Sequence, residues 1–423
     1  MKVFNFTKKM NVKTFLVTLA VVGLSVSSLM AQTADVYVGG YDNGKATVWK
    51  NGMPQYLANK GEIYSVVVNN GNVYAAGYES VSGMGIAKVW KNGTELYASN
   101  TNSHYSSIAV SESGVVYVTC IEEVSGQWVG RVWKDGVVET GYTGASWLSS
   151  IFIDGSDIYA AGYTADNNAA VWKNGTLLYT LSSGGLDVAT SVFVFEGDVY
   201  TTGNEYVNRI PQFKVWKNNA TLYTYNTSGV GSLGSSIYIS NGVIYASGLH
   251  QQYDEYQNYV YIATLWTDGI ATELASGTDG RYTEGRSVFV YGSDVYVAGA
   301  NWDPVYPPVT NKSDAMLWVN GTATTLSTGD SYANSVFVVE AVTGITDVER
   351  NATVQVYPNP TTGQLMIESG NLQVDKVEIY DIAGKIILTS HATMINISQF
   401  SAGTYFVKLK TGKGELTKKV IKE

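Results

Sequence analysis

Apolar residues alternate with polar or small residues in short runs along most of the chain, which is the pattern of half-buried β-strands. The runs at residues 65–68, 191–194 and 287–290 each begin with serine and continue with valine or phenylalanine. Such residues favour strands, and turn-forming residues separate one run from the next. No stretch between residues 35 and 340 has the 3.6-residue period of an amphipathic helix. The pattern predicts an all-β structure for this range.

These strands belong to an internal repeat marked by tryptophan. A five-residue motif, Val-Trp-Lys-Asn-Gly at Val48–Gly52, recurs at spacings of 39 to 52 residues, and some copies match it only in part. Its tryptophans are Trp49, Trp90, Trp133, Trp172, Trp216, Trp266 and Trp318. Each unit contains four short strands, and the tryptophan closes the third. A repeat of this size is typical of a propeller blade, so the sequence predicts a seven-bladed β-propeller with the tryptophans packed between blades.

The turns and the ends of the repeat support this prediction. Asn-Gly or Asp-Gly pairs, such as residues 51–52 and 135–136, follow most third strands and tolerate two positive φ angles in a tight hairpin. Residues 35–37 form a second-strand sequence without a first strand before it, and residues 335–338 supply a first-strand sequence after the last unit. We therefore expect the last strand to complete the first blade of a propeller at residues 32–340, which leaves no open sheet edge.

The strand order, with a tryptophan at the end of the third strand, resembles the layout of WD-repeat propellers. The Gly-His pair of that family is absent, and lysine, threonine or valine follows the tryptophan where the family has aspartate. The resemblance therefore concerns blade geometry and implies no function.

The N-terminal segment has the three-part organisation of a secretory signal peptide. Four lysines precede an apolar run at residues 15–24, and small residues follow near residue 31. The run is shorter than the roughly 20 apolar residues of a membrane-spanning helix. We expect a signal peptide at residues 1–31, cleavage before Gln32 and no transmembrane segment in the mature chain.

The C-terminal segment carries a series of short motifs in a fixed order. Their residues include Tyr357, Pro358, Asn359, Pro360, Gly363, Gly384, Lys385, Gly403, Tyr405 and Lys419. These blocks resemble a type A C-terminal sorting domain of the type IX secretion system of Bacteroidota. The resemblance implies a small Ig-like β-sandwich at residues 353–423 after a linker at 341–352. It also implies the type IX machinery as partner and a secreted or cell-surface location, reached through the periplasm.

Charge and reactive residues narrow the range of functions. Residues 32–340 contain 28 acidic and 14 basic residues, so nucleic acid is not an expected partner. The single cysteine, Cys120, is expected to be a small buried apolar residue. The histidines His104, His250 and His391 lack metal-ligand spacing and are expected in solvated loops. We therefore assign no metal, cofactor or catalytic residue.

One face of the predicted propeller differs from the other. Loops between second and third strands vary in length and, with the inter-blade loops, contain exposed aromatic residues, which suit a binding surface. The predicted ligand-binding residues are Trp128, Trp147, Tyr206, Tyr253, Tyr256, Trp302 and Tyr306.

This pattern predicts a secreted recognition protein for glycan or protein. One alternative is a polysaccharide hydrolase or lyase with its site at the propeller channel, and another is a non-catalytic adhesive or structural surface protein. The candidate ionisable residues for an enzyme are Asp187, Arg281, Glu284, Arg286 and Asp330. A serine near the start of each first strand either lines the channel mouth with hydroxyls or, as we favour, satisfies nearby backbone groups.

Overall fold

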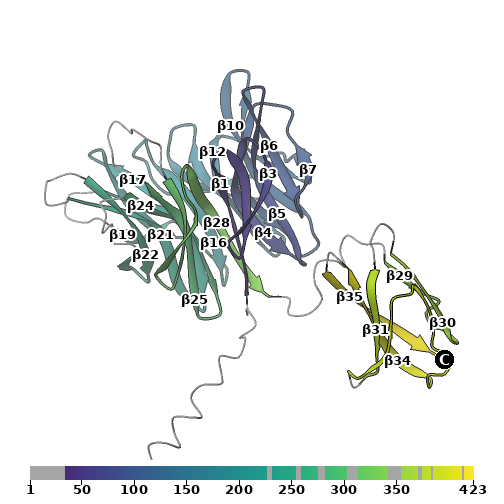
Figure 1. The fold of residues 1–423 in the computed structure, drawn as a ribbon. Helices are drawn as coiled ribbons and strands as arrows, with labels where there is room; N and C mark the ends of the chain where they lie inside the picture. Colours follow the sequence, from purple (N-terminus) through teal and green to yellow (C-terminus); the bar gives the residue numbers. More distant parts are fainter. Residues whose placement is uncertain are drawn as a thin grey trace, which may run out of the picture. The chain divides into compact units, whose positions relative to one another are not determined.

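The structure is a computed structural model that describes residues 34–225, 231–253, 259–274, 282–302, 313–341, 354–369, 374–382, 384–411 and 414–423. The predicted signal peptide lies outside these residues, as does most of the predicted linker. Ala34–Val339 form one compact unit, and the residues from Glu340 to Glu423 belong to a second. Within the described ranges the regular structure consists of β-strands (Figure 1).

Seven four-stranded sheets that resemble propeller blades make up the first unit. Sheet 1 contains β28 (Ser331–Glu340), β1 (Ala34–Asp42), β2 (Lys45–Lys50) and β3 (Met53–Ala58). Sheet 2 contains β4 (Gly61–Asn69), β5 (Asn72–Val81), β6 (Met84–Lys91) and β7 (Thr94–Ala98). Sheet 3 contains β8 (Ser103–Val110), β9 (Val116–Val124), β10 (Gln127–Lys134) and β11 (Val137–Val138).

The remaining four sheets repeat this order. Sheet 4 contains β12 (Ala145–Asp154), β13 (Asp157–Thr164), β14 (Ala169–Lys173) and β15 (Thr176–Thr180). Sheet 5 contains β16 (Val188–Phe195), β17 (Asp198–Val207), β18 (Ile210–Lys217) and β19 (Ala220–Tyr225). Sheet 6 contains β20 (Ser232–Ser240), β21 (Val243–Tyr253), β22 (Tyr259–Thr267) and β23 (Ile270–Glu273). Sheet 7 contains β24 (Tyr282–Tyr291), β25 (Asp294–Trp302), β26 (Ser313–Val319) and β27 (Thr322–Ser327).

The last strand of this unit completes the first sheet, as the sequence predicts. β28 lies beside β1 in sheet 1, although almost three hundred residues separate them in the chain. In every sheet the fourth strand of this order lies at one edge, which in sheet 1 is β3. Sheet 1 differs only in that the N-terminal segment contributes three of its strands and the C-terminal segment one.

The repeated serines connect each sheet to the next. In all seven sheets the serine Oγ accepts a hydrogen bond from the backbone N–H of the residue after the corresponding serine of the following sheet, at 3.1–3.3 Å. The serines are Ser65, Ser107, Ser150, Ser191, Ser236, Ser287 and Ser335, and the series closes on itself. The backbone role that we favoured for these serines is confirmed.

The recurrent Val-Trp-Lys-Asn-Gly motif has three structural roles, which its first copy illustrates. Trp49 is fully buried. Lys50 lies 5.4 Å from the ring centre of Tyr37 and 3.1 Å from a carboxylate oxygen of Asp35. Asn51 has a φ of 52°, and its side-chain oxygen accepts a hydrogen bond from the N–H at the start of the second strand, at 2.8 Å. The same turn-to-strand bond recurs in all seven sheets.

Two expectations about strand length are wrong. The regions around Trp128 and Tyr206 were expected to be loops, but β9 and β10, like β17 and β18, continue to tight turns. The turn residue Ser125 has a φ of 53° and Gly126 a φ of 79°, which completes the first hairpin in two residues. The first strands likewise begin before their serines. Polar residues in these segments, such as Glu122 and Asn204, belong to paired strands, so polarity alone did not mark the strand ends.

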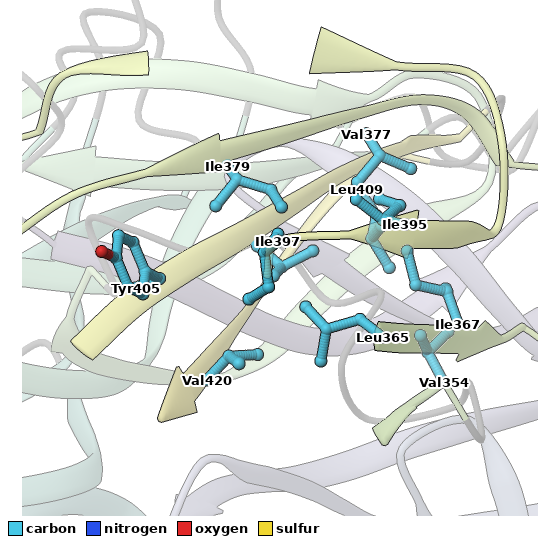
Figure 2. Close-up of a cluster of buried hydrophobic side chains, with 11 residues drawn as sticks. Val354, Leu365, Ile367, Val377, Ile379, Ile395, Ile397, Tyr405, Leu409 and Val420 are labelled. Atoms are coloured by element: carbon cyan, nitrogen blue, oxygen red, sulfur yellow. The ribbon is translucent and has the colours of Figure 1, made fainter. Parts of the chain in front are cut away.

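The second unit is a β-sandwich. One sheet contains β29 (Gln355–Tyr357), β30 (Gln364–Glu368) and β33 (Met394–Asn396). The other contains β32 (Ile386–Ser390), β31 (Val374–Tyr380), β34 (Gly403–Thr411) and β35 (Gly414–Lys422). Figure 2 shows apolar side chains from both sheets pointing toward one another, including Leu365, Ile379 and Ile395. In β30 exposed and buried residues alternate, as one solvent face and one core face require.

Candidate functional site

A concave pocket opens on the side of the first unit that carries the hairpins between second and third strands. Its volume is about 510 Å³, within the range of small-molecule sites. The lining residues come from sheets 2, 3 and 4 and are Tyr64, His104, Ser106, Ile121, Trp128, Trp147, Ser149 and Tyr163. Two of the residues that the sequence predicted for ligand binding, Trp128 and Trp147, therefore lie in the same pocket.

Three lining residues occupy an irregular position in the first strands. The pairing register shifts immediately before the repeated serine in β4, β8 and β12, and the extra residue is Tyr64, Ser106 or Ser149. A bulge redirects the side chain of its extra residue. The serine after the bulge is the same in every sheet, whereas the bulged residue differs. The variable residue immediately before the repeated serine is therefore the sequence feature that could have identified this part of the pocket.

The aromatic side chains of the pocket form two groups. Trp147 and Tyr163 are cross-strand partners on β12 and β13, with nearly parallel rings whose centres are 6.4 Å apart. On β8, the His104 ring lies 4.4 Å from the ring of Tyr78 and 6.4 Å from that of Trp128, measured between centres. Trp128 is 46% exposed, so a ligand can reach it.

Two glycines make room for this arrangement. A Cβ atom on Gly85 would lie 2.7 Å from Nε2 of His104, and one on Gly130 would lie 3.1 Å from the carbonyl carbon of Trp147. Both distances are shorter than a normal van der Waals contact, so the absence of a side chain allows the imidazole and the β12 backbone to pack where they do.

The pocket lining combines a mostly apolar, aromatic surface with a few polar groups, none of which is charged at neutral pH. Burial lowers the pKa of His104, which keeps the imidazole neutral. Burial raises the pKa of Tyr163, and burial together with the charge of Glu62 raises that of Tyr64. Both phenols therefore keep their protons. The groups available to a ligand are aromatic surfaces, hydroxyls and one neutral imidazole, each of the polar groups able to donate or accept a hydrogen bond.

Sequence reasoning missed several of these residues. It placed His104 and His250 in solvated loops, but both lie in strands, β8 and β21, and are half-buried. The Nδ1 atom of His250 is 2.7 Å from Oγ1 of Thr264. Because neither histidine shares a periodic motif with other repeats, only the fold could place them. Cys120 is fully buried, as expected.

Three of the other predicted binding residues, Tyr206, Tyr253 and Trp302, lie elsewhere on the first unit. Trp302, at the end of β25, packs with its ring centre 6.2 Å from that of Tyr282, which in turn lies 4.9 Å from that of Tyr261. Tyr206 is half-buried in β17, and Tyr253 is 48% exposed at the end of β21. Tyr256 and Tyr306 lie outside the described residues. The structure thus contains a second aromatic group, Tyr261, Tyr282 and Trp302, on sheets 6 and 7.

The ionisable residues that we considered for catalysis and that the structure describes have structural partners. Asp187 is 1% exposed, and its carboxylate accepts hydrogen bonds from the backbone N–H groups of Gly184 and Tyr206 at 3.0 and 2.9 Å. Asp330 accepts a hydrogen bond from the hydroxyl of Tyr41 at 3.0 Å. Burial and this bond raise the pKa of Tyr41 to about 12. Arg281 lies outside the described residues.

Arg286 belongs to a polar chain that joins three sheets. Its guanidinium lies 4.8 Å from the ring centre of Tyr332, pairs with Glu284 and donates to Oδ1 of Asn334 at 2.6 Å. The Asn334 amide donates to Glu62 at 2.7 Å. The chain of contacts runs from sheet 7 through β28 of sheet 1 to β4 of sheet 2, so it links the sheets at the point where the ring closes.

In the second unit, one sorting-motif residue connects the start of the domain to its last strand. The Asn359 side chain donates to the carbonyl of Lys419 and accepts from the N–H of Ile421, both at 2.8 Å. Tyr405 is buried and donates to the carbonyl of Ser401 at 2.8 Å. A Cβ on Gly363 would lie 2.7 Å from that of Ser398, and Gly384 has a φ of 79°. The motif residues therefore shape the sandwich.

Comparison with known proteins decides the identity of this second unit. Residues 355–423 match the family model of the secretion system C-terminal sorting domain. The type IX sorting domain directs export through the periplasm to the extracellular space or the outer cell surface. The described part of the chain contains no apolar helix of membrane-spanning length. No curated protein matches the chain.

Several solved structures are similar to the chain as a whole. The extracellular domain of a hybrid two component system of B. thetaiotaomicron is 9% identical, with a TM-score of 0.35, and the match covers 90% of this chain and 61% of that one. The β-propeller domain of the Trilobed protease from Pyrococcus furiosus is 8% identical, with a TM-score of 0.41 and coverage of 84% and 94%. A β-fructofuranosidase from Bombyx mori is 13% identical, with a TM-score of 0.34 and coverage of 85% of both chains. None of these similarities bears on activity.

Proposed function

We propose that this exported protein recognises an extracellular ligand, a glycan or a protein, through the pocket on sheets 2 to 4. The observation that carries the proposal is the convergence of Trp128 and Trp147, from different sheets, with Tyr64, His104 and Tyr163 around one cavity. Tyrosine and tryptophan offer large contact areas at a small cost in side-chain entropy. The sorting domain accounts for delivery of this surface to the outside of the cell.

An enzyme with a site at the channel is supported less well. Asp187 accepts two backbone hydrogen bonds, and Glu284 pairs with Arg286. These carboxylates therefore have structural partners. The adhesive alternative makes a different prediction, because adhesion without a discrete ligand would not depend on two tryptophans that line one pocket.

The test uses the full chain from residue 32 onward, presented to arrays of polysaccharides and of extracellular proteins. For the ligand with the strongest signal, replacement of Trp128 or Trp147 by alanine is expected to weaken binding by about 1–3 kcal/mol per residue. Ile270→Ala is the matched control, since this residue is 73% exposed on the fourth strand of sheet 6. Unchanged binding by both tryptophan variants would place the recognition site elsewhere.

A further inference from the structure

We infer that the ligand of this pocket is a neutral glycan, with one pyranose unit held among Tyr64, His104, Trp128, Trp147 and Tyr163. The inference rests on the proposed function, because it specifies the chemical class that the same pocket accepts. The lining, the charge and the shape of the pocket each support it.

The lining matches the two sides of a sugar ring. A pyranose presents a C–H surface on each face and hydroxyls around its rim, and C–H surfaces pack against aromatic rings. The pocket supplies aromatic rings from sheets 2, 3 and 4, together with the hydroxyls of Ser106 and Ser149. Hydroxyls and a neutral imidazole can both donate to and accept from sugar hydroxyls.

The charge of the pocket disfavours an anionic ligand. The eight lining residues include no aspartate, glutamate, lysine or arginine, and the one titratable nitrogen base, His104, has its pKa lowered by burial. The nearest carboxylate in sequence, Glu122 beside the lining residue Ile121, is buried and lies 3.9 Å from Nε of Arg131. Glu62, two residues before Tyr64, accepts a hydrogen bond from Asn334. Residues 32–340 as a whole are acidic, with 28 acidic and 14 basic residues. A uronate or sulfate group would enter this pocket without a counter-charge and against the overall field.

The shape of the pocket favours a sugar unit over a flat apolar molecule. The rings of Trp147 and Tyr163 are within 11° of parallel, and the ring of His104 is tilted 56° from that of Trp128. Both groups contribute to one cavity of about 510 Å³. Aromatic surfaces in different orientations can pack against different C–H surfaces of a puckered ring, and hydroxyls between them reach the rim.

The experiment measures binding of defined oligosaccharides to the full chain by calorimetry, supported by tryptophan fluorescence. The probes are neutral hexasaccharides (cello-, xylo-, malto- and laminarihexaose), an acidic one (hexagalacturonate) and a cation (trimethyllysine). At least one neutral hexasaccharide is expected to bind, and its affinity should change less than twofold between 50 mM and 500 mM sodium chloride, because a neutral ligand has no charge to screen.

Three variants locate this binding. Trp147→Ala is expected to lower the affinity at least tenfold, and Trp147→Phe to restore part of it, since phenylalanine retains a flat apolar surface. Leu177→Ala is the matched control, because this residue is 46% exposed on β15 of the same sheet and lies outside the pocket lining. Thermal unfolding of each variant shows that the fold is retained.

The outcomes separate the two proposals. If only hexagalacturonate, trimethyllysine or a protein binds, and this binding depends on Trp147, the neutral-glycan inference is wrong and the proposed function stands. If neutral hexasaccharides bind equally to the wild type and to both Trp147 variants, the pocket is not the site and both proposals fail. If no neutral hexasaccharide binds, the inference is wrong.

Discussion

The side-chain oxygen of Ser335 accepts a hydrogen bond from the backbone N–H of Val66 at 3.1 Å, across 269 positions of sequence. This contact joins the last strand of the first unit to the strand that follows sheet 1 in space. The same hydrogen bond recurs between every pair of neighbouring sheets, so the local pattern of the repeat also closes the ring.

Loss of this contact should destabilise the first unit. Ser335→Ala leaves the Val66 N–H without its acceptor in a buried position, which is expected to lower the free energy of unfolding by about 1–3 kcal/mol. Urea unfolding followed by tryptophan fluorescence is the measurement. All 10 tryptophans lie at or before residue 318, so the signal reports only this unit. Ser235→Ala, at a bulged position next to Ser236, is the control and should change stability by less than half as much. Equal effects of the two substitutions would contradict the role of the ring.

Asp42 should make the stability of the same unit depend on pH. Burial alone would raise the pKa of this carboxyl, but hydrogen bonds from Ser327, Asn43, Tyr56 and Ser331 outweigh it and hold the pKa below its ordinary value. A pKa lowered by folding stabilises the protein above the unfolded-state pKa of about 3.9, and the contribution is lost as the pH falls through the folded-state pKa.

The variant Asp42→Asn tests this relationship. The amide cannot accept from four donors, so the unfolding free energy at pH 7 should fall by about 1–3 kcal/mol. The difference between wild type and variant should shrink as the pH is lowered from 5 to 3, as measured by urea unfolding at each pH. A difference that stays constant over this range would show that the charge of Asp42 does not contribute.

The second aromatic group should affect long ligands and spare short ones. Trp302 packs with Tyr282 on sheet 7, whereas the pocket lies on sheets 2 to 4. We therefore predict that Trp302→Ala leaves the affinity for a hexasaccharide within twofold and weakens binding of the corresponding polysaccharide by about 1–3 kcal/mol. Affinity electrophoresis in gels that contain the polysaccharide measures the second effect. An equal loss for both ligand lengths would mean that Trp302 acts on the pocket itself.

The sorting domain should control location without affecting the fold of the first unit. Truncation after Val342 removes all residues that match the sorting family, while the seven sheets and their cores remain. The truncated protein is expected to accumulate in the periplasm with an unchanged tryptophan-fluorescence unfolding curve. Immunoblots of periplasmic, surface and medium fractions provide the measurement. Normal amounts of truncated protein at the surface would contradict the prediction.

The sequence by itself determined the repeated architecture, because each repeat has the same residue types at its turns, its buried positions and its first strand. Positive φ angles at Asn51 and its counterparts, burial at Trp49 and its counterparts, and serines that bond to the next sheet all follow from residue types at fixed positions. The sorting motif could also be recognised from the sequence, because its residues form contacts within one small sandwich of about 70 residues. Such local patterns predict strands and turns without any knowledge of the tertiary contacts.

Only the tertiary structure decided the pocket. Tyr64 and Tyr163 are almost a hundred residues apart, and they meet because sheets 2, 3 and 4 are neighbours. Their neighbour His104 follows no repeat pattern, and its burial depends on the space left by Gly85. The sequence assigned Trp128 and Trp147 to one face of the unit, but it could not group them, because their convergence depends on packing between sheets, which has no local signal.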